Sequence, residues 1–401
     1  MVKQTAKFSF MEQWNIIKAY DYCYNVTDGT HDSPKQTEFG KYLITSKHIK
    51  DNRIDFESAY KISEDDYNKI ITRSKVDQWD IIISMIGAYC GFCCIESSKQ
   101  TDYAIKNVGL LKVGNELKCK WLYYYLTSPH GKQQLSKLRS GSSQPYISLG
   151  ALRNLDIPVP NENTMSDIVS VLSSLDSKIE LNRRINDNLE QQAQALFDHY
   201  FDSGSIYLED SIMGCLTDIA VYLNGLAMQK FPATDIERSL PVLKIKELGQ
   251  RKCDDCSDRC SDSIDADYII DNEDIIFSWS GTLMVDVWCG GKCGLNQHLF
   301  KVTPLKNYPR WFVYYWTNRH LKKFKLIAKD KAVTMGHIRR GDLENAEVAI
   351  PTNLNMLEIN ARINPLFQSI IDRRLEITKL ENIRDALLPK LMSGELTINE
   401  I

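Results

Sequence analysis

The sequence repeats itself at a spacing of about 190 residues, and this duplication limits the possible folds more than any other feature. Residues 80–87 read DIIISMIG and residues 274–281 read DIIFSWSG, so that Asp, Ile, Ile, Ser and Gly fall in the same places. Residues 107–113 (NVGLLKV) and 296–302 (NQHLFKV) form a second pair, 189 residues apart. Solenoid repeats have only about 20 to 50 residues. The sequence therefore predicts two copies of a whole domain.

Both copies follow the same internal order. Short β-like runs broken by Gly, Pro, Asn and Asp are mixed with helices, and a strand ending in proline comes next (Pro160 and Pro351). A long helical segment completes each copy. We therefore predict an α/β protein with two α+β domains and two helical regions, at residues 1–160, 161–203, 204–352 and 353–401.

The helical segments carry the clearest periodicity. Slots alternate in steps of four and three residues at 168, 172, 175, 179, 182, 186, 189, 193 and 196, and the same slots recur 191 residues later. This spacing predicts a coiled coil between the two helices, with polar insertions that fix its register. The alternative is that each helix only covers its own domain. The predicted interface residues are Leu175, Ile179, Asn182, Asn186, Leu189, Leu366, Ile370, Arg373, Ile377 and Leu380.

Each helical segment contains a possible break. Asn364-Pro365 is typical of a helix cap followed by proline at the first helical position, and Ser173-Ser174 occupies the same place in the first copy. We therefore expect a short helix, a break and a long helix of about 25 residues in each copy. Pro389 is expected to end the second long helix.

Positive charge is concentrated at two equivalent places, although the chain has 49 Lys and Arg against 52 Asp and Glu. The clusters lie at 130–153 and 319–340, just before each proline-terminated strand. Two equivalent clusters favour contacts to DNA phosphates, whereas a single one would equally suit a solvated helix face. The candidate DNA-binding residues are Lys132, Lys137, Arg139, Ser142, Ser143 and Gln144 in the first copy and Lys322, Lys323, Lys325, Lys329, Lys331 and Thr334 in the second.

The remaining candidate sites are weaker. Cys253, Cys256 and Cys260 have a CxxC spacing that can hold zinc, but nine carboxylates lie from Asp254 to Asp274 and favour an acidic surface loop without metal. Trp279 and His298 suit base contacts or the core, and the core is favoured.

No catalytic motif is present. The sequence contains neither GxxxxGK[ST], HExxH nor GxSxG, and NPLF at 364–367 departs from the NPP[FY] motif of adenine methyltransferases. We therefore assign no catalytic and no metal-binding residue. The sequence shows no signal peptide and no run of about 18 apolar residues, so we expect a cytoplasmic protein with no membrane contact.

With these residues in view, the chain resembles the specificity subunits of type I restriction-modification systems. The segments DIIFSWSGTL, CGLNQHLFKV and LENIRDALLPKLMSGEL carry the resemblance most strongly, and the first copy matches less well. The resemblance implies two target recognition domains that each read one half of a split, asymmetric site on double-stranded DNA. It implies that the two helices pair antiparallel as a ruler for the spacer between the half-sites.

The resemblance also implies partners. Two methyltransferase subunits would dock on the helices, and restriction and translocase subunits would join them. S-adenosylmethionine, ATP and Mg²⁺ would belong to those partners, leaving this chain without a cofactor. Two alternatives remain: a nuclease that acts alone, and a coiled-coil scaffold that does not bind DNA.

Overall fold

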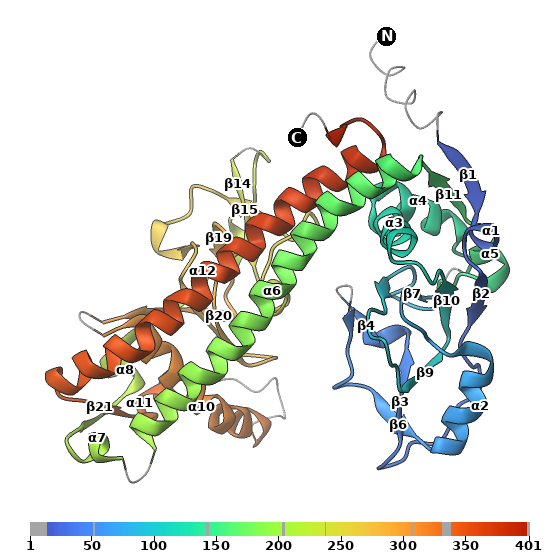
Figure 1. Cartoon of the computed structure of the whole chain (residues 1–401). Coiled ribbons are helices and arrows are strands. Elements are labelled where there is room, and N and C mark those ends of the chain that lie inside the picture. The colour runs from blue at the N-terminus through green and yellow to red at the C-terminus, as the bar shows by residue number, and fades with distance from the viewer. Residues whose placement is uncertain are drawn as a thin grey trace. The chain divides into compact units, whose positions relative to one another are not determined.

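The structure is a computed structural model that describes residues 14–50, 53–141, 144–202, 205–236, 238–305, 308–330 and 338–398. The chain divides into two compact units (Figure 1). Unit 1 contains Met1–Ser177 and Asn382–Ile401, and unit 2 contains Lys178–Glu381. We call the part of unit 1 before the first long helix the first domain, and the part of unit 2 between the two long helices the second domain. No helix in the described residues is long and apolar enough to cross a membrane.

The first domain is built on a four-stranded antiparallel sheet. Its order is β2 (Asn25–Asp28), β10 (Val108–Lys112), β7 (Asp80–Ser84) and β8 (Cys93–Ile95). A three-stranded sheet and two ribbons accompany it: β6 (Tyr60–Ile62), β3 (Lys41–Thr45) and β9 (Tyr103–Lys106); β1 (Asn15–Lys18) with β11 (Asp156–Val159); and β4 (Ile49–Lys50) with β5 (Arg53–Ile54). The helices are α1 (Ala19–Tyr22), α2 (Glu64–Ser74), α3 (Glu116–Thr127), α4 (Pro129–Leu138) and α5 (Leu149–Arg153).

The second domain repeats this plan. Its four-stranded sheet has the order β13 (Ala220–Asn224), β20 (Leu299–Pro304), β17 (Ile275–Ser278) and β18 (Met284–Val287). The further strands are β12 (Ile212–Cys215) with β21 (Glu347–Ile350), and β15 (Arg259–Ser261), β14 (Ser239–Leu243), β19 (Cys293–Leu295) and β16 (Ile269–Ile270). The helices are α7 (Ile206–Glu209), α8 (Leu216–Ile219), α9 (Ile245–Gln250), α10 (Arg310–Asp330) and α11 (Arg340–Glu344). The matching strand orders agree with the predicted duplication.

The repeated DII motif opens the central strand of each sheet. Asp80 and Asp274 each accept a backbone hydrogen bond from the residue three positions earlier, at 2.8 and 2.9 Å, and so close the turn into β7 and β17. The two Ile residues are buried in both strands. Gly87 and Gly281 have φ angles of +79° and +63°, which disfavour residues with a Cβ. The motif therefore recurs because each copy needs the same turn, strand and loop.

The two long helices, α6 (Glu162–Phe201) and α12 (Asn353–Met392), have 40 residues each. Both are continuous, so the expected break and the expected end at Pro389 are wrong. The residues four positions before the two prolines, Ala361 and Asp385, are exposed, so water can satisfy the carbonyl groups that lose an amide partner. Ser174 donates its hydroxyl to the carbonyl of Val171 within the helix and does not cap a new one.

The predicted seam follows the contact between α6 and α12, which lie side by side in each unit (Figure 1). None of the nine slots on either helix is exposed. In unit 1, Arg384 donates a hydrogen bond to Asp176. In unit 2, Asn182 donates one to Glu376, and Asn186 donates one to the carbonyl of Ile370. Residue numbers rise along α6 as they fall along α12, so the helices are antiparallel.

Two ion pairs of this seam are equivalent. Arg183 of α6 donates to Glu381 of α12 at 2.7 Å, and Arg374 of α12 donates to Glu190 of α6 at 2.8 Å. The two arginines are 191 residues apart, and so are the two glutamates. The helices therefore exchange roles across a local twofold axis, as a duplicated chain requires.

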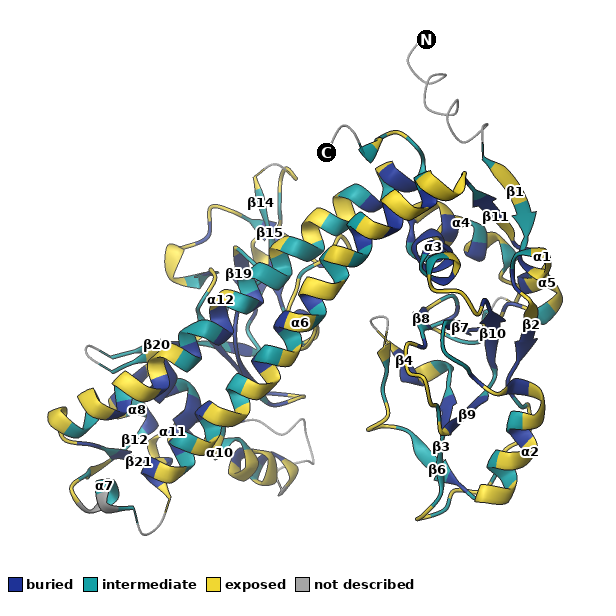
Figure 2. Cartoon of the chain, in the orientation of Figure 1, coloured by how far each residue is buried: buried dark blue, intermediate teal, exposed yellow. Residues whose placement is uncertain are grey.

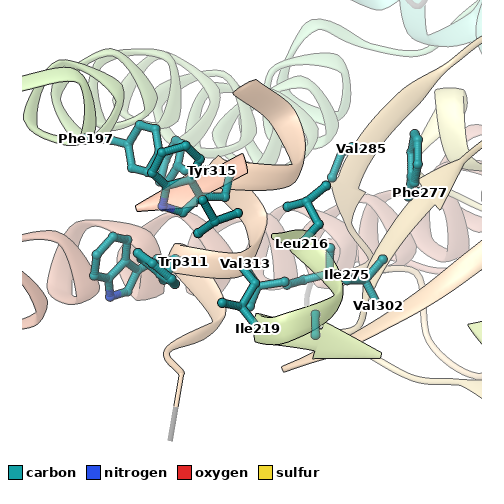
Figure 3. Close-up of a cluster of buried hydrophobic side chains, with 14 of the residues drawn as sticks. Phe197, Leu216, Ile219, Ile275, Phe277, Val285, Val302, Trp311, Val313 and Tyr315 are labelled. Atoms are coloured by element: carbon teal, nitrogen blue, oxygen red, sulfur yellow. The ribbon is translucent and has the colours of Figure 1, made fainter. Parts of the chain in front are cut away.

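Each domain packs its sheet and helices against its own part of the helix pair, and burial is concentrated along these contacts (Figure 2). In unit 2, Phe197 of α6 stacks on Tyr315 of α10 with ring centroids 5.3 Å apart, beside the apolar face of β17 and β20 (Figure 3). In unit 1, Leu172 of α6 and Leu391 of α12 join one core with Trp121 of α3. The helices are therefore part of both cores.

Candidate nucleic-acid interface

The candidate interface lies at one end of each four-stranded sheet, which we call the loop end. In the first domain, β2 and β7 finish there and β10 and β8 begin. In the second domain, β13 and β17 finish there and β20 and β18 begin. Ile147, in the segment that follows α4, and Ile338, between α10 and α11, both lie at this end.

The same backbone hydrogen bond joins the two loops of each domain. The amide of Ile147 donates to the carbonyl of Met85 at 2.9 Å, and the amide of Ile338 donates to the carbonyl of Trp279 at 3.1 Å. In the first domain the amide of Gly87 also donates to the carbonyl of Pro145, at 2.9 Å. The two loop ends therefore have a common backbone frame.

Aromatic side chains surround the loop end of the first domain. Phe92 and Tyr146 are 48% and 45% exposed, and Tyr89 contacts Phe92 edge to face at 5.7 Å. Exposed rings beside polar loops are suited to contacts with bases and sugars. These three residues were not among the sequence-predicted candidates, although GAYCGF at 87–92 places Tyr89 between two glycines and Phe92 directly after the second.

Arg139 holds this loop in place. Its Nη2 donates to the carbonyl of Cys90 at 2.5 Å, and a side chain at Gly91 would meet the same nitrogen. Burial raises the pKa of the Cys90 thiol, although Arg139 lowers it in part, so the thiol stays protonated. Arg139 thus has a role within the protein, besides the DNA contact predicted for it.

A polar residue ends the first strand of each sheet and differs between the copies. Asp28, at the end of β2, binds Nε2 of His31 at 3.0 Å and also pairs with Arg73. Nδ1 of His31 lies 3.1 Å from Asn107. This polar cluster lies at the loop end, and its residues were not among the sequence-predicted candidates.

In the second domain, Asn224 takes the place of Asp28. Its side-chain oxygen accepts a hydrogen bond from the indole nitrogen of Trp279 at 2.9 Å. Trp279 is half-buried beside Phe300 and His298, and Nδ1 of His298 lies 3.0 Å from the hydroxyl of Ser280. Trp279 therefore belongs to the edge of the core and to the loop end together.

The predicted basic residues that the structure describes are exposed. Lys132 and Lys137 are exposed on α4, and Gln144 is exposed in the loop that follows. Lys322, Lys323, Lys325 and Lys329 are exposed along α10. Ser142, Ser143, Lys331 and Thr334 lie outside the described residues. The DNA contacts of all these residues remain predictions.

The predicted interface residues of the helices also have definite places. Ile179, Asn182, Asn186 and Ile370 are buried, whereas Leu175, Leu189, Leu366, Arg373, Ile377 and Leu380 are half-buried. An amide hydrogen bond from Asn182 lowers the pKa of Glu376, and Lys178 adds to this effect. Asn182 and Asn186 therefore have hydrogen-bond partners on the opposite helix.

The cysteine cluster is dispersed in space. Cys256 is exposed, Cys260 is buried in a small core around β14, and half-buried Cys253 packs against a different core that contains Cys293. Within the part of the chain that the structure describes, no three His, Cys, Asp or Glu side chains converge in a way that would hold a metal ion.

Comparison with known proteins agrees with this architecture. A family model described as the type I restriction modification DNA specificity domain matches residues 12–191 and 213–384. The type I restriction enzyme MjaIX specificity subunit of Methanocaldococcus jannaschii is 25% identical over 304 residues, which are 70% of each chain. The MjaVIII specificity subunit of the same organism is 25% identical over 188 residues, 45% of this chain and 43% of that one.

A solved structure has the same fold. The crystal structure of the type I restriction-modification S subunit from M. genitalium matches with a TM-score of 0.53 at 16% identity, covering 94% of this chain and 96% of that one. The structure of this chain has two equivalent α+β domains and a pair of antiparallel long helices. The loop end of each domain has the same backbone arrangement. The chain belongs to the type I restriction-modification specificity subunits, and the resemblance found in the sequence is confirmed.

Proposed function

We propose that the chain reads a bipartite, asymmetric site on double-stranded DNA, one half-site with the loop end of each domain. The observation that carries this proposal is that the two loop ends share a backbone arrangement but have different side chains at equivalent positions. The hydrogen bond between the two loops recurs, but Met85 stands where the second domain has Trp279, and Asp28 stands where it has Asn224. Met85 and Asp28 are themselves buried, so in this proposal these differences act through the exposed side chains that they position, such as His31 beside Asp28. Base edges are distinguished by donors, acceptors and apolar contacts.

The basic helices supply affinity in this proposal. Lys132 and Lys137 of α4 and four lysines of α10 are exposed, and in this proposal they neutralise phosphates beside the half-sites. Affinity should therefore fall steeply as salt concentration rises, whereas the choice of bases should not change.

We further propose that the helix pair is the docking site for two methyltransferase subunits and for the restriction subunits that join them. The equivalent pairs Arg183–Glu381 and Arg374–Glu190 give two equal partners two matching surfaces. Catalysis would belong to those partners, with S-adenosylmethionine on the methyltransferases and ATP with Mg²⁺ on the restriction subunits. This chain would select the sequence.

The decisive experiment compares methylated bases across the genome of the source organism with and without this gene. Loss of one split, asymmetric methyladenine motif on deletion would establish the function and supply both half-sites. If deletion changes nothing, purified methyltransferase and this chain are tested together on genomic DNA. Failure of that complex to methylate would reject the proposal.

A domain exchange separates the proposal from its two alternatives. Replacing residues 1–145 with those of a relative should change one half-site and leave the other unchanged. A nuclease that acts alone would cut DNA without partners, and a scaffold that does not bind DNA would show no change of motif. A change in both half-sites would reject the assignment of one half-site to each domain.

A further inference from the structure

The second domain is joined to the helix pair by a buried group of charges. Asp286 of β18 accepts a hydrogen bond from Nη1 of Arg374 on α12 at 2.6 Å and one from Nε of Arg251 at 2.7 Å. The other terminal nitrogen of Arg374 donates to Glu190 on α6 at 2.8 Å. Arg374 therefore connects an edge strand of the sheet to both long helices at once.

The centre of this junction, the pair of Arg374 and Asp286, is nearly closed to solvent, and its hydrogen bonds are directional. The side chains of Arg374 and Asp286 are only 9% and 11% exposed. Burial alone would lower the pKa of Arg374, but the carboxylates of Asp286 and Glu190 raise it, so the guanidinium stays charged. Two further hydrogen bonds lie beside it, from Arg374 to the carbonyl of Val287 and from Thr378 to the carbonyl of Cys289.

The first domain has no carboxylate at the place that Asp286 occupies in the second domain. In β17 and β18, Ile276 pairs with Asp286, and in β7 and β8 the equivalent Ile82 pairs with Cys94. Cys94 is buried in an apolar core and has no carboxylate. The helix pair itself is duplicated as Arg183–Glu381. The carboxylate in the sheet is thus specific to the second domain.

We propose that Asp286 is a positioning residue that fixes the orientation of the second domain on the helix pair, and so fixes the spacer length that the protein accepts. This inference rests on the proposed reading of a split site. One added base pair moves a half-site by about 3.4 Å along the duplex and turns it by about 35°. A domain held at its sheet edge by directional charged hydrogen bonds resists both displacements. Without that carboxylate, the domain can follow a displaced half-site.

The test uses the complete chain in complex with its methyltransferase subunits. The substrates are duplexes with both half-sites and either the native spacer or one that is a base pair shorter or longer. For Asp286→Ala, the preference for the native spacer should fall about tenfold or more. The rate on the native spacer should stay within about threefold. Rejection of a single wrong base in a half-site should not change.

Three further variants make the outcome specific. Asp286→Asn keeps the side-chain volume, so a loss of spacer preference there excludes a cavity as the cause. Asp286→Glu keeps the carboxylate and should restore part of the preference. Glu381→Gln weakens the equivalent ion pair with Arg183, which joins only the two long helices, and should keep the wild-type spacer preference.

The inference is overturned if folded Asp286→Ala and Asp286→Asn keep the wild-type spacer preference, or if Glu381→Gln loses it equally. Failure of the proposed function itself would be recognised from the wild-type complex. In that case the wild-type complex methylates no duplex at any spacing, and the inference falls with the function.

Discussion

The two units hold the same tyrosine against a long helix in opposite chemical ways. In unit 1, the hydroxyl of Tyr124 on α3 donates to Asp176 on α6 at 2.7 Å. In unit 2, the equivalent Tyr314 on α10 meets Phe367, which is 191 residues after Asp176, with ring centroids 5.4 Å apart. One contact is a hydrogen bond to a charge and the other is aromatic packing. The duplicated fold therefore conserves the place where α3 or α10 contacts a long helix, but the kind of interaction at that place differs.

The two units also carry their buried charged groups at different positions. Unit 1 pairs Arg384 with Asp176 beside Tyr124, where unit 2 has Ala193 and Phe367. Unit 2 instead places its buried charges at the sheet edge, with Arg374 and Asp286, where unit 1 has Cys94 in the sheet. Polar contacts therefore attach each domain to its helices, but those around Asp176 in unit 1 and around Arg374 in unit 2 lie at different positions. The duplication preserves the need for an attachment while its position has diverged.

The largest expected difference between the units comes from one apolar position. Phe197 of α6 is fully buried among aromatic rings, and Leu388, 191 residues later on α12, is buried in the core of unit 1. Phe197→Ala should destabilise unit 2 by about 4 kcal/mol and Leu388→Ala should destabilise unit 1 by about 3 kcal/mol, because each leaves a cavity. Hydrogen exchange resolved by segment is the appropriate measurement, since unfolding of two units is not one two-state transition.

The control for this pair is Phe197→Leu, which removes less volume and should cost about 1 to 2 kcal/mol. Exchange should increase first within the unit that carries the substitution. Equal acceleration in both units after either change would show that the units unfold together, and the comparison would then lose its basis.

The next effect separates the two charged attachments. Arg374→Ala removes the buried partner of Asp286 and leaves it with Arg251, whose side chain is 57% exposed, so the substitution should cost about 3 kcal/mol. Arg384→Ala should cost only about 1 kcal/mol, because Arg384 is 20% exposed and Asp176, 32% exposed, keeps the hydrogen bond from Tyr124. Segment-resolved hydrogen exchange near β18 and α3 measures both.

A double variant tests the reason for that difference. Arg374→Met with Asp286→Leu removes both buried charges, and Glu190 stays solvated because it is 41% exposed. This variant should recover most of the stability lost by Arg374→Ala, since an apolar pair can replace a buried ion pair. Continued loss in the double variant would show that geometry, and not the unpaired charge, causes the effect of Arg374→Ala.

Much of the scaffold was predictable from the sequence because it repeats. The Asp, Ile, Ile, Ser and Gly of the DII motif mark a turn, a buried strand and a loop, and the structure uses each for that purpose. The seam was predictable because burial follows a regular spacing on a helix. The break at Asn364-Pro365 was wrongly predicted because a local signal was read without the packing that overrides it.

The candidate interface was less accessible to sequence reasoning. Basic clusters and small polar loops stand out in a chain of net charge −3, but Asp28, His31 and Asn107 come together only through strand pairing. The same holds for Asn224 and Trp279, which are 55 residues apart in the chain. Arg139 carried a positive-charge signal, although its nearest partner proved to be a carbonyl group inside the domain. Such assignments depend on contacts between distant segments.

The smallest predicted effect distinguishes the two tyrosines directly. Tyr124→Phe removes a hydrogen bond to the carboxylate of Asp176 and should destabilise unit 1 by about 1 to 2 kcal/mol. Tyr314→Phe keeps the ring contact with Phe367 and should change the stability of unit 2 by less than about 0.5 kcal/mol. Hydrogen exchange in α3 and α10 provides matched readings on equivalent helices. Similar losses from both substitutions would mean that the hydroxyl of Tyr314 is as important as that of Tyr124. The two tyrosine contacts would then contribute equally to stability, although the residues that they meet on the long helices, Asp176 and Phe367, differ.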